Sequence, residues 1–337
     1  MARQQSCGHA QRHTLVAVST LAILLVSTVE SHAQKFVLPP PKDTAEARRF
    51  AFFAYDRDLP LNVVLHPKDS NTKRKRTLVS FDSVHDQRVS SILALPTSSK
   101  APYPAIILVH GSGGNKDTSY IQWVSEALVA QGYATLSIDT QYHGDRARTG
   151  RNGEIHLPDS YTMRDAWVQS VVDLRRTVDY LLSRPDIDKN KIGYMGFSQG
   201  AMLGAVLGGV EERIAAFCLA VPGGGLMQIV QNLDKYPVIK ARWPIRITPE
   251  KLKVIEEVVD ITDPIHYVGR ILPRPLLIVV AKHDEIIPPE ASIALIEAAG
   301  AKEPEHIRRW ESGHVLHPNA LFDVRNFFTS NFGKRTP

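Results

Sequence analysis

Cysteine is scarce in this 337-residue sequence, which contains only Cys7 and Cys218. Two cysteines exclude the disulfide-rich scaffolds on which many small secreted domains depend. The sequence also has no large excess of charge of one sign, since it contains 40 basic and 35 acidic residues and its formal net charge is +5. So weak a bias does not indicate a protein that binds nucleic acid.

The composition lacks the signatures of disordered and fibrous chains as well. Hydrophobic residues make up 43% of the sequence and charged residues 22%, which is an ordinary balance for a folded domain. No internal repeat is visible. A chain of roughly 300 residues buries about three-quarters of the surface that its unfolded form exposes. The length is therefore sufficient for a stable core without disulfides, in one large domain or two small ones.

Long hydrophobic runs are limited to the N-terminus. Two arginines precede an apolar run from Thr14 to Val26, and Ser31 and Ala33 occupy the two positions at which a signal peptidase requires small residues. The run is shorter than the ~20 residues of a membrane-spanning helix. We therefore expect residues 1–33 to be a cleaved signal peptide, with an uncleaved anchor as the alternative. The mature protein would then be secreted or periplasmic, with no stable membrane anchor.

Residues 34–76 are predicted to form a leader segment that precedes the main domain. Within it, residues 43–55 have the apolar spacing of a helix, and the basic run at 73–76 is predicted to be a solvated loop. The main domain is expected over residues 77–337.

From Thr77 onward, short apolar segments alternate with segments of helical periodicity. The eight predicted strands are 78–84, 88–95, 105–109, 134–138, 191–195, 215–221, 276–281 and 306–310. The predicted helices of this region are 118–130, 163–182, 199–207, 289–299 and 319–328. Such alternation is typical of a mostly parallel sheet covered by helices, and the first two strands are close enough to form an antiparallel hairpin.

Residues 225–270 interrupt this alternation after the sixth predicted strand. Thr248 and Pro249 are a good start for a helix that continues to about Val259, with threonine as the cap and proline in the first turn. The segment is predicted to be a small helical insertion over the sheet. It is either a lid or cap that shapes a substrate pocket, or a plain helical connection whose apolar face packs on the sheet.

A candidate nucleophile lies in the segment 196–200, which has the form Gly-x-Ser-x-Gly with Ser198 at its centre. A predicted strand leads into the segment and a predicted helix leads out. Such a strand–turn–helix unit holds a serine in a strained conformation with its hydroxyl exposed, and glycines flank it because side chains there would clash. The alternative is a turn of small residues without a reactive serine.

A serine hydroxyl needs a neighbouring base, and the base needs an acid to orient it. Asp284 follows the apolar strand 276–281, and His314 lies in the loop after the last predicted strand. We expect Asp284 to be the acid and His314 the base. Glu285 is the rival acid, and His317 is the rival base.

Donors for a developing oxyanion are expected in the glycine-rich turn 110–114, which follows the strand 105–109. The candidates are the backbone N–H groups of Ser112 and Gln199. The turn does not fit a nucleotide site, because the Gly-x-Gly-x-x-Gly pattern that begins at Gly111 fails at Lys116.

No motif in the sequence predicts a metal or an organic cofactor. His283, His314 and His317 are close in sequence but lack a recognised ligand spacing. In the loop after the strand 134–138, His143 or Arg146 is a candidate contact for substrate or for a product carboxylate. The alternative is that aspartate and arginine in this loop simply brace it.

These motifs together resemble the α/β-hydrolases, in particular the group of dienelactone-hydrolase-like and acetyl-xylan-esterase-like esterases, over about residues 77–328. The elements that carry the resemblance are the turn 110–114 and, in the order the family uses, Ser198, Asp284 and His314. The resemblance implies an α/β-hydrolase fold with a mostly parallel eight-stranded sheet. It also implies a serine hydrolase that cleaves small-molecule or polysaccharide-linked carboxylic esters through an acyl-enzyme intermediate, and the predicted signal peptide makes it a secreted one.

One departure from the group concerns the nucleophile, which is cysteine in dienelactone hydrolases proper and serine here. That difference favours an ordinary ester as substrate. The Gly-x-Ser-x-Gly turn around Ser198 is also similar to the corresponding turns of cutinases and acyl thioesterases. A peptidase, thioesterase or acyltransferase on the same fold is therefore the alternative function. A binding protein without catalysis would have no need for the serine, the acid and the histidine together.

Overall fold

The structure of the protein, a computed structural model, describes residues 36–148, 153, 160–242 and 246–333. These residues belong to a single structural unit. The segment predicted to be a signal peptide, 1–33, lies outside the described residues. Within the described ranges, no helix has the length and hydropathy needed to cross a membrane.

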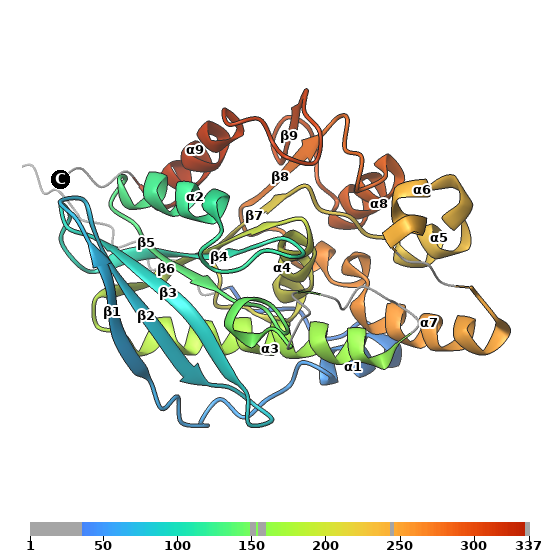
Figure 1. Cartoon of the computed structure of the whole chain (residues 1–337), viewed down its shortest axis with the longest axis horizontal. Helices are drawn as coiled ribbons and strands as arrows, with labels where there is room; N and C mark the ends of the chain where they lie inside the picture. The colour runs from blue at the N-terminus through green and yellow to red at the C-terminus, as the bar shows by residue number, and fades with distance from the viewer. Residues whose placement is uncertain (1–35, 149–152, 154–159, 243–245, 334–337) are drawn as a thin grey trace, which may run out of the picture. The chain divides into compact units, whose positions relative to one another are not determined.

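A nine-stranded sheet runs through the described part of the chain, in the order β1-β2-β3-β5-β4-β6-β7-β8-β9 (Figure 1). The strands are β1 (Val64–Ser70), β2 (Arg74–Asp82), β3 (Arg88–Pro96), β4 (Tyr103–Val109), β5 (Ala134–Ile138), β6 (Ile187–Phe197), β7 (Ala216–Ala220), β8 (Leu276–Ala281) and β9 (Ile307–Trp310). β1, β2 and β3 are antiparallel to their neighbours, and all pairs from β5 to β9 are parallel. The predicted mixed fold with an antiparallel hairpin and a parallel sheet is confirmed.

Helices connect most of the parallel strands. The α-helices are α1 (Thr44–Ala51), α2 (Ser119–Val129), α3 (Tyr161–Ser183), α4 (Gln199–Val210), α5 (Leu226–Gln231), α6 (Pro237–Arg242), α7 (Pro249–Thr262), α8 (Pro289–Ala299) and α9 (Ala320–Phe332). Short 3-10 turns are η1 (Gly144–Arg146), η2 (Leu233–Lys235), η3 (Pro264–His266) and η4 (Val268–Arg270).

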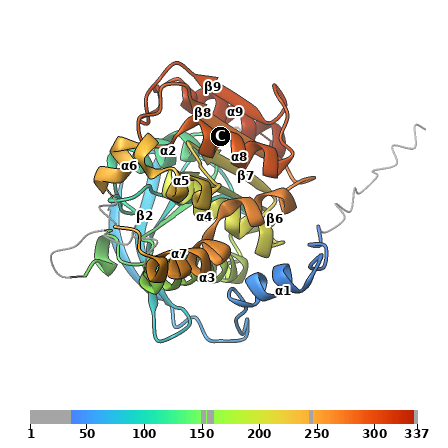
Figure 2. The same ribbon diagram turned by 90° about the vertical axis from the view of Figure 1, so that its right-hand side faces the viewer.

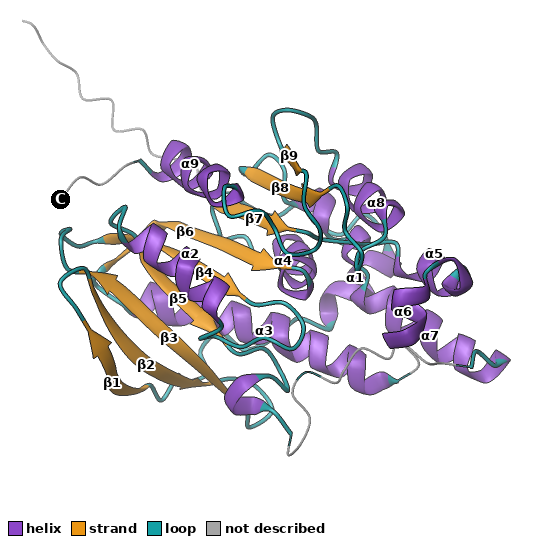
Figure 3. Ribbon diagram, turned by 45° about the horizontal axis from the view of Figure 1, so that its top comes forward, coloured by secondary structure: helices purple, strands orange, loops and turns teal. Residues whose placement is uncertain are grey.

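The helices form a layer on each face of the sheet, as Figure 3 shows. Alternate residues of each central strand point to opposite faces, because side chains in a strand have a period of two. Ile107 of β4 packs toward α3 and α4, whereas its neighbours Ile106 and Leu108 pack toward α2 and α9. Strands buried on both faces explain why their sequences are continuous apolar runs.

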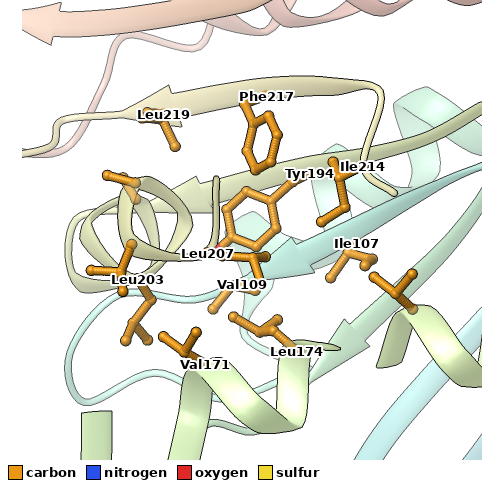
Figure 4. Close-up of a cluster of buried hydrophobic side chains, with 14 of the residues drawn as sticks. Ile107, Val109, Val171, Leu174, Tyr194, Leu203, Leu207, Ile214, Phe217 and Leu219 are labelled. Carbon is orange, nitrogen blue, oxygen red and sulfur yellow. The ribbon is translucent and has the colours of Figure 1, made fainter. Parts of the chain in front are cut away.

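Tyr194 of β6 lies at the centre of the larger core cluster (Figure 4). Its ring centroid is 5.9 Å from that of Phe217 on β7, and its hydroxyl donates a hydrogen bond to the carbonyl of Gly200 on α4. Gly204 brings the α4 backbone against this ring, since a Cβ there would lie 2.2 Å from a ring carbon of Tyr194. The helix that follows Ser198 is therefore packed directly on the strand that precedes it.

The sheet has one strand more than the eight predicted. The additional strand is β1, at residues 64–70, which the sequence assigned to the leader. Every residue of β1 is exposed, so it has no alternation of apolar and polar residues to reveal it. The basic run was also predicted wrongly as a solvated loop, because Arg74 begins β2 and Arg76 is buried against Asp69 and Asp117.

The described residues of 225–270, which are 225–242 and 246–270, form the predicted helical insertion, with α5, α6 and α7 grouped together in Figure 2 and α7 beside α3. Asp263 joins the two ends of this segment, because its carboxylate accepts hydrogen bonds from the backbone N–H groups of Gly225 at 2.9 Å and Leu226 at 2.6 Å. Arg49 of α1 pairs with Asp260 at 2.6 Å. The segment is thus closed on itself by Asp263, and it is attached to the rest of the structure through α1 and α3.

We predict that Gly204→Ala destabilises the protein although alanine is the better helix former. The new methyl group would overlap the buried ring of Tyr194, and overpacking of a core typically costs about 1–3 kcal/mol, which exceeds the ~1 kcal/mol gained in helix propensity. Urea denaturation should show a lower free energy of unfolding. The loss should be smaller in a Tyr194→Leu background, and an equal loss in both backgrounds would contradict the explanation.

Candidate active site

The residues predicted to form the site follow parallel strands at their carboxyl ends. Because β4, β6, β8 and β9 are parallel members of one sheet, the turns that follow them lie at one edge. The turn 110–114 follows β4, Ser198 follows β6, Asp284 follows β8 and His314 follows β9. The fold thus brings together residues that are up to about 200 positions apart in the sequence.

Ser198 sits in a sharp turn between β6 and α4, with φ at +51° and ψ at −116°. A positive φ is unfavourable for a residue that has a side chain, so the surroundings must hold it in place. The backbone N–H of Ser198 donates to the carbonyl of Ala220 on β7 at 2.8 Å. A Cβ at Gly196 would lie 2.3 Å from the carbonyl oxygen of Gly200, and one at Gly200 would lie 2.5 Å from that of Val109. Both glycines are required for the tight turn, as predicted.

His314 connects Ser198 to Asp284. Its Nε2 atom lies 3.0 Å from the hydroxyl oxygen of Ser198, and its Nδ1 atom lies 2.9 Å from each carboxylate oxygen of Asp284. A carboxylate only accepts hydrogen bonds, so Nδ1 donates to it and Nε2 is left to accept the proton of the serine hydroxyl. The side chain of Asp284 is 7% exposed and that of His314 is 20% exposed.

Backbone groups orient the carboxylate of Asp284. Its Oδ1 atom accepts hydrogen bonds from the N–H groups of Ile286 at 2.9 Å and Ile287 at 2.8 Å. These contacts leave both oxygens directed at the imidazole. The carboxylate of Asp284 is therefore oriented by backbone groups of the turn in which Asp284 itself lies.

The rival acid and base have other contacts. Glu285 accepts a hydrogen bond from the backbone N–H of His314 at 2.9 Å, and this contact lowers the pKa of its carboxyl. Glu285 thus fixes the loop that carries the histidine. The ring of His317 stacks on that of Trp310 at a centroid separation of 5.5 Å, and His283 pairs with Glu311. The described residues contain no cluster of three or more His, Cys, Asp or Glu side chains suited to a metal ion.

The turn 110–114, predicted to supply an oxyanion donor, lies against Ser198. A Cβ at Gly111 would be 3.2 Å from the Cβ of Ser198, and Ser112 and Ser198 line the same cavity. Gln199 is the first residue of α4, where backbone N–H groups have no partner within the helix and favour negative charge. The N–H of Gly111 donates to the hydroxyl of Tyr120 at 2.9 Å, which anchors the turn to α2.

A buried polar network joins the segment that follows the turn 110–114 to the loop after β5. Lys116 donates to Asp139 through its backbone N–H at 2.7 Å and its ammonium group at 2.6 Å. Arg146 pairs with the buried Asp173 at 2.6 Å, and His143 is fully buried. These contacts support the interpretation in which the loop after β5 is braced, rather than the one in which His143 or Arg146 meets substrate.

Tyr120 and Lys116 are supporting residues that sequence reasoning missed. Lys116 was noted only because it breaks a nucleotide-binding pattern, and nothing marked Tyr120 as the partner of a backbone group nine residues earlier. Both lie within the first turns after β4, where a glycine-rich loop needs side chains to hold it. That requirement is the signal that could have found them.

Comparisons with known proteins agree with this architecture. The acetyl xylan esterase from Paenibacillus sp. R4 superimposes with a TM-score of 0.70 at 20% identity, covering 89% of this chain and 97% of that one. YtaP of Bacillus subtilis (strain 168) is 24% identical over 249 residues, which are 68% of this chain and 78% of YtaP. The mitochondrial acyl-coenzyme A thioesterase 2 of Rattus norvegicus is 26% identical over 251 residues, which are 70% of this chain but only 49% of the thioesterase.

The strand order and the turn at Ser198 define an α/β-hydrolase, and the structural likeness shows the same fold. The family described as Acetyl xylan esterase (AXE1) matches residues 52–308, which is most of the chain. The chain belongs to this family and is a carboxylic ester hydrolase. The predicted resemblance to acetyl-xylan-esterase-like α/β-hydrolases is thereby confirmed.

His110 at the start of the oxyanion turn generates a prediction about acid stability. Its Nδ1 atom donates to the carbonyl of Gly111 at 2.8 Å, and its Nε2 atom accepts from the backbone N–H of Thr140 at 3.3 Å. The second contact requires an unprotonated Nε2 and therefore a neutral ring, and burial lowers the pKa of His110 to about 4. Since an unfolded histidine titrates near ~6.5, the stabilisation is complete above that pH and is lost as the pH falls toward about 4.

We therefore expect His110→Gln to reduce the acid sensitivity of the fold. Between about pH 7 and pH 5 the wild-type protein should lose roughly 1–2 kcal/mol of unfolding free energy through this residue. The variant should be less stable at neutral pH, but its stability should fall less over this interval. Urea denaturation at the two pH values measures the difference, and parallel losses in both proteins would show that His110 is not the titrating group.

Proposed function

We propose that the protein hydrolyses carboxylic esters through Ser198, His314 and Asp284, with an acyl-enzyme intermediate. The observation that carries the proposal is the position of His314. Its Nε2 atom lies 3.0 Å from the hydroxyl oxygen of Ser198, and its Nδ1 atom lies 2.9 Å from the carboxylate of Asp284. This is the geometry in which an imidazole can take the proton of an attacking hydroxyl.

In the first half of the reaction, Ser198 attacks the ester carbonyl carbon while His314 takes its proton at Nε2. Asp284 stabilises the imidazolium that forms, because its carboxylate faces Nδ1 at 2.9 Å. His314 then gives this proton to the alkoxide that leaves, and the acyl group remains on the serine oxygen. In the second half, His314 takes a proton from water, and the resulting hydroxide attacks the acyl carbon. The bond from that carbon to the serine oxygen then breaks, the acid leaves, and His314 returns the proton to Ser198.

The negative charge that develops on the carbonyl oxygen is assigned to the backbone N–H groups of Ser112 and Gln199. Gln199 begins α4, so the partial positive charge of the helix N-terminus lies beside the reacting carbonyl. The turn that contains Ser112 is held by Tyr120 and lies against Ser198. Each well-placed donor of this kind contributes roughly 10²–10³ in rate.

The substrate is proposed to be a carboxylic ester, either a small molecule or an ester carried by a polysaccharide. The name of the family and the name of the Paenibacillus neighbour include acetylated xylan among the second kind. Thioester hydrolysis is the second candidate, favoured by the likeness to the rat thioesterase over most of this chain. Both reactions use the same attack on a carbonyl carbon.

Replacement of the nucleophile tests the mechanism. Ser198→Ala should reduce the hydrolysis of p-nitrophenyl acetate by several orders of magnitude, because removal of one member of a triad disables the unit. Ser312→Ala is the matched control, since its buried hydroxyl has no hydrogen-bond partner and lies two residues before His314. Substantial activity in Ser198→Ala, with the fold intact by circular dichroism, would refute the assignment.

The same assay separates the two candidate reactions. If acetate esters of simple alcohols are cleaved faster than acetyl thioesters of matched leaving-group size, the protein is an esterase by preference. The opposite order would favour the thioesterase.

We further propose that the protein is exported and that residues 1–33 are removed. The support is the sequence itself, with its basic start, its apolar run of limited length and the small residues Ser31 and Ala33. Expression of the full chain in a bacterium with an intact export system should yield a product in the periplasm or medium whose N-terminal residue is Gln34. A full-length product that stays with the membrane fraction would indicate an uncleaved anchor instead.

A further inference from the structure

We propose that the cavity beside Ser198 receives a large apolar hydrocarbon group of the ester, belonging either to its acyl part or to its alcohol part. The inference rests on the proposed function, because it specifies the substrate of the same site. It departs from the acetyl group that the family name suggests.

The cavity has a volume of about 770 Å³ and is continuous with the reacting groups, since Ser198, His314 and Ser112 all line it. Its floor is formed by β6 and by the turns after β4 and β7, and its walls by α2, the loop after β9 and α9. The walls lie on one face of the sheet (Figure 1). A site that begins at the nucleophile and extends between two helices accommodates part of the substrate rather than a separate ligand.

Most of the lining is hydrocarbon. The side chains that enclose the cavity beyond the catalytic residues include Trp123, Val124, Ala127, Val315, Leu316 and Leu321. An apolar group transferred from water onto such a surface gains about 25 cal/mol for each Å² that it buries.

The polar side chains in the lining are few, and Tyr120, Glu126 and His317 each already have a protein partner. The hydroxyl of Tyr120 accepts from the N–H of Gly111, and Glu126 pairs with Arg74 at 3.0 Å. His317 accepts from the backbone N–H of Asn319 at 3.2 Å through Nδ1. A sugar chain brings many hydroxyl groups that need partners, and this lining is poorly suited to supply them.

The volume also exceeds what an acetyl group needs. A water molecule accounts for ~30 Å³ of liquid, so a group of three heavy atoms fills only a small part of a cavity of about 770 Å³. Binding sites for small organic ligands are typically ~300–1,000 Å³. The cavity therefore matches a substrate with a chain of several carbons or an aromatic ring.

Two of the apolar side chains that line the cavity are exposed, one on α2 and one in the loop after β9. Trp123 on α2 is 63% exposed and Val315, next to His314, is 86% exposed, although both line the cavity. Single exposed apolar side chains are common on proteins, but apolar side chains gathered at the mouth of an apolar cavity are typical of a ligand-binding groove. The two residues come from facing elements, so a hydrocarbon chain between them would be covered on both sides.

The 225–270 insertion contributes none of the described residues that line this cavity. α5 and α7 instead pack on each other through Leu226, Val230, Ile255 and Val259. The specificity of this cavity is therefore assigned to α2, α9 and the loop between β9 and α9 rather than to the segment that the sequence suggested as a lid.

Two series of esters test the proposal and identify the group that enters the cavity. Ethyl esters of acids from acetate to octanoate vary the acyl part, and acetates of alcohols from ethanol to octanol vary the alcohol part. Rates are followed by acid release below the solubility limit of each ester. In one of the two series, kcat/KM should rise by about fourfold for each methylene that becomes buried, and by at least about 100-fold over the series.

A substitution that fills the cavity should remove this preference. Ala127→Phe places a ring in the space between α2 and α9 and should lower the ratio of kcat/KM for the longest ester to that for ethyl acetate at least tenfold relative to wild type, a ratio that a general loss of activity would not change. Ala130→Phe is the matched control, because it makes the same change on an exposed residue at the end of α2 that does not line the cavity. Trp123→Ala, at an exposed position, should lower long-chain kcat/KM several-fold without affecting the fold.

The outcomes separate this inference from the proposed function. A preference for acetate in both series, faster cleavage of acetylated xylo-oligosaccharides than of any long-chain ester, or an unchanged preference in Ala127→Phe and Trp123→Ala would each overturn the inference. In those cases the loss of activity in Ser198→Ala would still uphold the mechanism. Failure of the wild-type protein to cleave any ester would instead refute the proposed function.

Discussion

The close packing of α4 on β6 is the constraint on which the site depends. The turn between them places Ser198 at a φ of +51°, and it closes only because Gly196 and Gly200 allow backbone atoms to approach within distances that no side chain would permit. Gly204 continues this contact one turn later by bringing α4 onto the ring of Tyr194. The unfavourable conformation of the serine is thus balanced by the burial of a helix and a strand against each other.

Strain of the same kind recurs around the site. Three residues that are not glycine have positive φ just after parallel strands, namely Tyr142 after β5, Ser198 after β6 and Val221 after β7. Each of these strand ends turns sharply into a loop at the edge of the sheet where Ser198, Asp284 and His314 lie. The loops are then fixed by buried polar contacts, such as those of Asp139 with Lys116 and of Asp263 with Gly225. In that setting the reacting groups need little reorganisation during the reaction.

The sequence predicted the parallel core well, because central strands are continuous apolar runs and the helices between them have clear caps and periodicity. The strand 276–281 and the helix 289–299 were predicted with the bounds that the structure has. β1 was missed since all of its residues are exposed, so that backbone pairing with β2 alone defines it. Arg76 was assigned to solvent because a run of four basic residues gives no indication that Asp69 and Asp117 will bury one of them.

The sequence alone determined the fold class, and it predicted Ser198, Asp284 and His314 as one set, because both inferences depend on local patterns and on their order along the chain. Tertiary structure decided the rest. Only the parallel arrangement of β6, β8 and β9 brings Nε2 of His314 to 3.0 Å from the hydroxyl oxygen of Ser198. Only the packing of α2 near α9 creates an apolar cavity between residues that are about 200 positions apart in the sequence. Such contacts have no signature in one segment of sequence, since they arise from the joint burial of several elements against the same sheet.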